Sequence, residues 1–196
     1  MSRVSGSDLT RPDSGTKLTY DDLEGMPDDG VRRELIDGEL YVTPSPNRKH
    51  QSIVLNLGYL MKAHLRQSQA GRVFVAPFDV LLSRIDVVEP DVLYISRARQ
   101  DEVLTAKHVV GAPDLVVEVG SPGTRRTDER VKQRLYERFA VPEYWIVDPD
   151  LDAIKVFRLV EMRYQRVQEL SLDAGGVLTT PLLPGLEMPL VEIFED

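Results

Sequence analysis

The sequence predicts an α/β fold in which a central mixed β-sheet is flanked by two long helices, with an N-terminal hairpin and a further β-hairpin. Three patterns support this prediction: two long segments with apolar residues at helical spacing, several short apolar runs bounded by Pro or Gly, and an Asp-Gly pair between extended segments. Helical segments that alternate with strands are typical of a sheet covered by helices. The 196 residues are enough for one such domain and few for two.

The composition is that of an ordinary globular protein, with 42% hydrophobic and 29% charged residues. No apolar run approaches the roughly 18 to 20 residues that a bilayer span requires. The first residues lack the apolar stretch of a secretory signal peptide. The chain has no cysteine, which excludes disulfides and thiolate metal sites. Together these features lead us to expect a cytoplasmic protein.

Residues 1–16 are rich in Ser, Gly, Asp and Arg and predict a flexible tail, which leaves 17–196 as a single domain. The net charge of −8 argues against a protein that coats nucleic acid by bulk electrostatics. It does not argue against a nuclease, because carboxylates that bind metal themselves lower the net charge. One local basic strip could contact a nucleic acid backbone or could simply be a solvated helix face; it comprises Arg125, Arg126, Arg130, Lys132, Arg134 and Arg138.

The N-terminal elements follow from capping and turn residues. Thr19 and Asp22 have the spacing of a capping box and predict the start of a short helix. The segment 33–43 predicts a hairpin, because Asp37-Gly38 is a favoured two-residue turn. From 47 to 69 the apolar residues predict the first long amphipathic helix; they are Ile53, Val54, Leu57, Leu60, Met61 and Leu65.

The rest of the chain alternates between short strands and one more helix. The apolar run Leu115–Val119 predicts a central strand, and 127–139 predicts the second long helix. The segments 153–159 and 163–169 predict the further hairpin. The remaining predicted strands are 73–75, 78–82, 91–95 and 143–147.

Two carboxylates lie in predicted strands of the sheet, one inside an apolar strand and one at the start of another. Glu118 lies within the apolar run 115–119, where a carboxylate costs several kcal/mol unless it is paired or binds a metal. Asp91 follows Pro90 at the start of another strand. If these strands are adjacent, a divalent cation with oxygen ligands would relieve the repulsion and would activate water. The alternative is that Asp91 caps a turn and Glu118 pairs with an arginine.

Five segments of the chain, in order, resemble the Uma-two family of restriction endonucleases within the PD-(D/E)XK nuclease superfamily. The resemblance covers most of the chain from about residue 18 to 190, and the last two segments are the most specific. The segments are Glu34-Leu-Ile-Asp-Gly-Glu39, Glu89-Pro-Asp-Val92, Gly111-Ala-Pro-Asp-Leu-Val-Val-Glu-Val-Gly-Ser-Pro122, Lys132-Gln-Arg-Leu-Tyr136 and Val141-Pro-Glu-Tyr-Trp-Ile-Val-Asp-Pro149.

The resemblance implies a restriction endonuclease-like fold and an active site that cleaves DNA with Mg²⁺, for which Mn²⁺ would substitute. It makes Asp91 the PD aspartate and Glu118 the second acid, with the Val119 carbonyl as a third metal ligand. The superfamily lysine should lie two residues after Glu118, but that position is Gly120. Lys132 on the following helix is the expected substitute, since the family carries a lysine there. A surface lysine is the alternative interpretation.

Other candidates have weaker support. Glu34 is either a third acid or a surface glutamate of an edge strand, and His50 is either an accessory residue or a cap. Ser121 could donate to a phosphate or be an ordinary turn residue, and Tyr136 shares a helix face with Lys132 and could be accessory or core. Pro113-Asp114 also spells the motif, but a continuous strand from 114 to 118 would separate the Cα atoms by roughly 13 Å, so that one metal could not bind both.

The sequence therefore predicts a metal-dependent DNA endonuclease. Two alternatives stay open: an inactive nuclease-fold module that binds DNA or protein, and a metal-dependent phosphohydrolase that acts on a small substrate. A homodimer is a further expectation, because the apolar C-terminal stretch could form an interface. It could equally pack on its own sheet; its residues are Leu182, Leu183, Leu186 and Leu190.

Overall fold

The computed structural model describes residues 16–43, 45–120 and 125–195, with the backbone only for 125–129. The predicted tail lies almost wholly outside these ranges. None of the described helices is both long and apolar enough to cross a bilayer.

The main sheet has six strands in the order β11-β10-β9-β8-β6-β3. Strands β8 and β9 run parallel and all other neighbours are antiparallel, so the sheet is mixed, as predicted. The sequence analysis found all six strands, with ends that differ by a few residues. They are β3 (Gly71–Val75), β6 (Val92–Ser96), β8 (Leu115–Val119), β9 (Glu143–Asp148), β10 (Ala153–Val160) and β11 (Arg163–Ser171).

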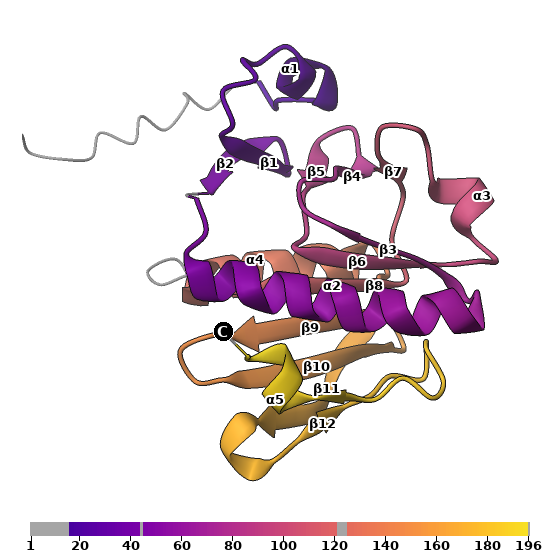
Figure 1. Cartoon of the computed structure of the whole chain (residues 1–196). Coiled ribbons are helices and arrows are strands. Elements are labelled where there is room, and N and C mark those ends of the chain that lie inside the picture. The colour runs from indigo at the N-terminus through magenta and orange to yellow at the C-terminus, as the bar shows by residue number, and fades with distance from the viewer. Residues whose placement is uncertain (1–15, 44, 121–124, 196) are drawn as a thin grey trace, which may run out of the picture.

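The two long helices cover opposite faces of this sheet, α2 (Arg48–Ser68) in front and α4 (Arg125–Arg138) behind (Figure 1). Alternate residues of β8 belong to different cores: Val117 packs in the cluster that contains α2, and Val116 in the cluster that contains α4. A strand buried on both faces needs apolar residues at consecutive positions. The acid at position 118 is therefore an exception that needs a partner.

Helix α2 begins where the sequence changes from prolines to an amphipathic repeat. The side chain of Asn47 accepts a hydrogen bond from the His50 backbone N–H at 2.9 Å, which satisfies one of the free donors of the first turn. Its buried face includes Ile53 and Leu57. The helix start is therefore set by a cap, and its orientation by apolar burial.

A second sheet, in the order β2-β1-β5-β4-β7, lies above the main sheet in Figure 1. The predicted hairpin forms two of its strands, and Asp37 and Gly38 have the positive φ angles, 53° and 76°, that their turn requires. The predicted strand 78–82 belongs to this sheet as β4. After it the chain turns at Arg84 and returns as β5, which pairs with β4. The strands are β1 (Arg32–Ile36), β2 (Glu39–Thr43), β4 (Val80–Ser83), β5 (Asp86–Val88) and β7 (Val109–Val110).

Short elements complete the fold, and the capping box of Thr19 and Asp22 at the first helix is confirmed. The C-terminal leucines pack on their own sheet: Leu183, Leu186 and Leu190 are buried in the α2-side core. This packing removes the observation on which the predicted dimer interface depended. The short elements are α1 (Tyr20–Glu24), α3 (Gln100–Val103), a 3-10 turn (Leu172–Ala174), β12 (Val177–Leu178), β13 (Met188–Pro189) and α5 (Leu190–Ile193).

The packing of α2 predicts a strong contrast between two neighbouring leucines. Leu57 is fully buried, whereas Leu55 is 70% exposed. We expect Leu57→Ala to lower the free energy of unfolding by about 3 kcal/mol, through lost burial and the cavity left behind. Leu55→Ala should stay within about 0.5 kcal/mol of the parent protein. Urea unfolding followed by circular dichroism measures both, and equal losses would contradict this account of the core.

Candidate functional site

The two predicted carboxylates meet at one end of the main sheet. Asp91 directly precedes β6, and Glu118 lies in β8. In this antiparallel pair Val92 is opposite Val117, so the same register places Asp91 opposite Glu118. One oxygen of Asp91, Oδ2, accepts a hydrogen bond from the Val119 N–H at 2.7 Å. The register of two strands 27 residues apart in the chain therefore brings together the two acids of the sequence motif.

Asp91 is buried but held in its charged form. Arg32 Nη1 donates to Oδ1 at 2.8 Å, and His50 Nε2 lies 3.4 Å from Oδ2. Burial by itself would raise the pKa of Asp91, but the contact with His50 and the charge of Arg32 outweigh it and hold that pKa well below its usual range. A carboxylate that stays ionised in a buried site is suited to binding a cation.

Glu118 is surrounded by donors from α4. Lys132 Nζ lies 3.0 Å from each carboxylate oxygen, and the Tyr136 hydroxyl donates to Oε1 at 2.6 Å. Lys132 and Tyr136 lie one helical turn apart, which puts both on the face of α4 that meets the sheet. Burial raises the pKa of Glu118 to about 7, with the charges of Asp91 and Glu34 adding to the effect and Lys132 opposing it.

Glu34 joins the same cluster from β1 of the second sheet. Its carboxylate accepts a hydrogen bond from Lys132 Nζ at 2.9 Å and another from the Glu89 N–H at 2.8 Å. Glu34 is only 1% exposed, so the alternative of a surface glutamate on an edge strand is wrong. The alternative of a surface lysine at position 132 is also wrong, because the side chain of Lys132 is only 13% exposed and bridges Glu34 and Glu118.

The sequence analysis missed two charged residues of the cluster, Arg32 and Glu89. Besides Asp91, Arg32 lies 3.8 Å from both Glu34 and Glu89. Burial raises the pKa of Glu89 to about 7. Nothing in the sequence separates Arg32 from the adjacent Arg33, which pairs with exposed Asp29 instead. Glu89 could have been found, because an acid directly before the Pro-Asp pair is unusual in an otherwise apolar stretch.

The cluster carries more negative than positive charge. Its two permanent cations are Arg32 and Lys132, while its four carboxylates belong to Glu34, Glu89, Asp91 and Glu118. A divalent cation would supply the missing positive charge, and carboxylate oxygens are the ligands that Mg²⁺ prefers. Within the described residues no three acids or histidines are placed to hold one ion together. Asp91 and Glu118, which lie opposite each other, therefore offer carboxylate oxygens from two residues to a metal ion.

The remaining candidates occupy different positions. His50 contacts Asp91 through its side chain, and only its backbone takes part in the helix cap. Tyr136 is fully buried and also hydrogen-bonds Glu118, so it is both core and neighbour of the site. Asp114 marks the start of β8 by accepting from the Ser96 N–H at 2.8 Å, away from the cluster, as expected. Ser121 lies outside the described residues.

The predicted basic strip does not form one face. Lys132 points into the cluster, and Arg138 forms an ion pair with buried Asp86. Arg130 and Arg134 are exposed, while the side chains of the first two arginines of α4 lie outside the described residues. The strip therefore divides between the site, a structural ion pair and the solvent.

Comparison with known proteins gives two matches of different kinds. Residues 19–191 match the model of the Uma2 family, which carries the description "Putative restriction endonuclease". Among solved structures, the chain is similar to "a putative nuclease belonging to DUF820" from Anabaena variabilis ATCC 29413, with a TM-score of 0.73 and 18% identity. That match covers 90% of this chain and 97% of the other, and at this identity it shows a shared fold. No curated protein matches.

The bridging lysine predicts a large and specific loss of stability. Lys132→Met would leave Glu34 and Glu118 buried without their shared cation, which costs roughly 3 kcal/mol or more of unfolding free energy. Lys62→Met is the matched control, because Lys62 is exposed and forms no ion pair within the described part of the chain; it should stay within about 0.5 kcal/mol. Urea unfolding at neutral pH measures both. Equal stability of the two variants would show that the bridge contributes nothing.

Proposed function

Because the chain belongs to the Uma2 family, whose description is "Putative restriction endonuclease", we propose that it is a Mg²⁺-dependent endonuclease that hydrolyses phosphodiester bonds in DNA. The observation that carries the proposal is the position of Lys132, whose ammonium lies 3.0 Å from both oxygens of Glu118. Position 120, where the superfamily has its lysine, is a glycine and carries no charge. Lys132 of α4 supplies the positive charge beside Glu118 instead. A lysine beside Glu118 supports the proposal, because the motif requires a cation near this acid.

Asp91 and Glu118, with the Val119 carbonyl, would hold the metal in this proposal. When bound, Mg²⁺ would lower the pKa of a coordinated water and neutralise charge on the phosphate, and Mn²⁺ would substitute for it. Tyr136 and the Val119 N–H fix one oxygen of each acid, so neither carboxylate is free to rotate. Fixed ligands cost little reorganisation at the moment of reaction.

Lys132 acts as a fixed cation and not as a base. Burial would lower the pKa of its ammonium, but Glu118 and Glu34 outweigh this and raise that pKa above its usual value. A lysine that stays protonated can donate a hydrogen bond to a phosphate oxygen and stabilise the charge that develops there. Arg32 likewise stays charged beside Asp91: burial would lower the pKa of its guanidinium, but the charges of Asp91, Glu34 and Glu118 outweigh this and raise that pKa.

One observation favours a second candidate function, a nuclease-fold module that binds nucleic acid or protein without cleavage. Arg32 contacts Asp91, and Lys132 contacts both oxygens of Glu118, so protein cations already engage the acids that would hold a metal. In such a module these ion pairs would be purely structural. The two functions differ in whether a divalent metal binds at the cluster and whether plasmid DNA is cut.

The endonuclease proposal predicts that both acids are essential. In Mg²⁺, the parent protein should nick supercoiled plasmid, and Asp91→Asn and Glu118→Gln should each reduce the rate at least about a hundredfold, because each removes a charged metal ligand. Asp114→Asn is the matched control, since it alters the other Pro-Asp pair, which lies outside the cluster; it should keep most of the activity. Gel electrophoresis of plasmid forms over time measures the rates. Retained cleavage in both site variants would refute the proposal.

Metal binding gives a test that does not depend on activity. A ligand that binds only the folded protein stabilises it by mass action, so Mn²⁺ at about a hundred times its Kd should add about 2.7 kcal/mol. The parent protein should therefore melt at a higher temperature in Mn²⁺ than in EDTA, and Glu118→Gln should lose this difference. Differential scanning calorimetry measures it. A parent protein whose Tm is the same in both buffers would favour the module without cleavage.

A further inference from the structure

The segment 40–78, which contains α2, has a charge opposite to that of the whole chain. Residues 40–78 contain no Asp or Glu, although the chain has a formal net charge of −8. This region spans the end of the first hairpin, the whole of α2 and β3. Its Lys and Arg residues are Arg48, Lys49, Lys62, Arg66 and Arg72. A cationic helix on an acidic protein indicates a local site for an anionic partner.

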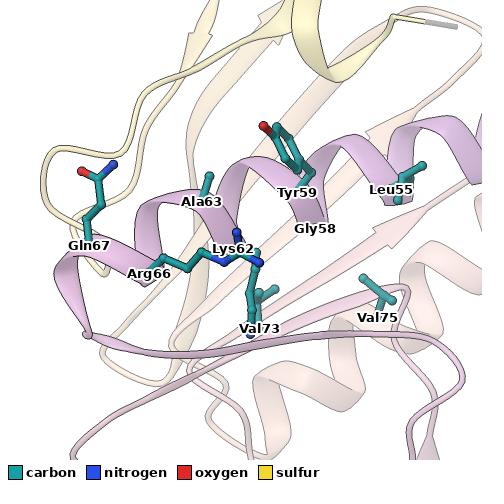
Figure 2. Close-up of a pocket in the computed structure, with 9 residues that line it drawn as sticks. All are labelled: Leu55, Gly58, Tyr59, Lys62, Ala63, Arg66, Gln67, Val73 and Val75. Carbon is teal, nitrogen blue, oxygen red and sulfur yellow. The ribbon is translucent and has the colours of Figure 1, made fainter.

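A groove of about 570 Å³ runs between α2 and the edge strand β3. Figure 2 shows Lys62 and Arg66 extending from the helix toward Val73 on the strand. Leu55 and Tyr59 also line the groove, and each is 70% exposed. The groove therefore combines two cations with apolar surface.

The two cations of the groove have no acidic partner among the residues that the structure describes. Within the described residues neither Lys62 nor Arg66 forms an ion pair, and both are exposed. Lys49, on the first turn of the same helix, is different, because it pairs with Asp152 at 2.7 Å. Lys62 and Arg66 are one turn apart, so their charges act at the same place on the helix surface.

The groove extends away from the cluster that contains Asp91 and Glu118. At one end, Val75 pairs with Val92, the residue after Asp91, and the Ala76 N–H donates to the Asp91 carbonyl at 3.1 Å. The N-terminal turn of α2 contacts Asp91 through His50. From His50 to Arg66 the helix rises about 24 Å at 1.5 Å per residue. That length matches about seven nucleotide steps of one DNA strand at 3.4 Å each.

We propose that the groove between α2 and β3 binds the DNA backbone beside the cluster that contains Asp91 and Glu118. Lys62 and Arg66 contact phosphates, and Leu55 and Tyr59 cover the apolar faces of the sugars. This inference rests on the proposed function only in taking DNA as the substrate. A second copy of the chain is the competing occupant, and its acidic surface would meet the same two cations.

The test measures DNA binding without cleavage. A fluorescein-labelled 20-base-pair duplex is titrated with protein in EDTA and again in Ca²⁺, and its anisotropy gives Kd between 50 and 200 mM salt. Lys62→Gln with Arg66→Gln should raise Kd about tenfold or more near 0.1 M salt. It should also reduce the slope of log K against log salt by about 1.8, since about 0.9 is lost with each phosphate contact.

A double variant with the same charge change elsewhere is the control. Lys107 and Arg166 are exposed, and Arg166 lies on β11, at the opposite edge of the main sheet from β3. Lys107→Gln with Arg166→Gln should leave Kd within about twofold of the parent protein. Equal weakening by both double variants would overturn the proposal, because it would show that only net charge matters.

Two further outcomes would also overturn it. One is a parent protein that does not bind the duplex in either buffer. The other is a groove variant that binds DNA like the parent protein but is a monomer in sedimentation velocity where the parent protein is a dimer. That result would assign the groove to a second copy of the chain. Plasmid nicking is measured separately. A protein that binds DNA through the groove but never cuts it would therefore refute the endonuclease and leave the groove intact.

Discussion

The structure depends on one buried cation, the ammonium of Lys132, between two carboxylates from different sheets. Glu118 comes from β8 of the main sheet, Glu34 comes from β1 of the second sheet, and Lys132 comes from the helix that packs behind them. Removing Lys132 leaves two buried carboxylates without their shared cation, which is far more costly than losing a surface ion pair. The same contact that holds three elements together therefore also assembles the proposed active site.

The cluster shows why such a site is costly to the fold. Four acids share two permanent cations, and burial raises the pKa of both Glu118 and Glu89, with neighbouring carboxylates adding to the effect. A core built for stability alone would replace these groups with apolar ones of similar size, often at no loss. Keeping them is consistent with a site prepared for a further cation. The apolar cores on either side of the sheet supply the stability that the cluster lacks.

The sequence predicted the main elements because their signals are local. Helical periodicity located α2 and α4, and the Asp37-Gly38 turn located the hairpin, since cap and turn residues act within a few positions. The second sheet was not predicted as a separate unit. Its strand β5 has three residues, too few to show a periodic pattern, and it joins the predicted hairpin through β1, which lies far from it in the chain. The choice of sheet for β4 likewise follows from pairing partners.

The sequence by itself singled out Asp91 and Glu118, because an acid in an apolar strand and an acid after Pro90 are visible as exceptions to a burial pattern. Only the tertiary structure decided how their charges are balanced. In the folded protein Lys132 points into the cluster, Arg32 and Glu89 belong to it, and Glu34 is buried. The physical reason is that burial and ion pairing depend on distances between strands and helices far apart in the chain. Those distances are set by packing and register, which no local pattern of residues records.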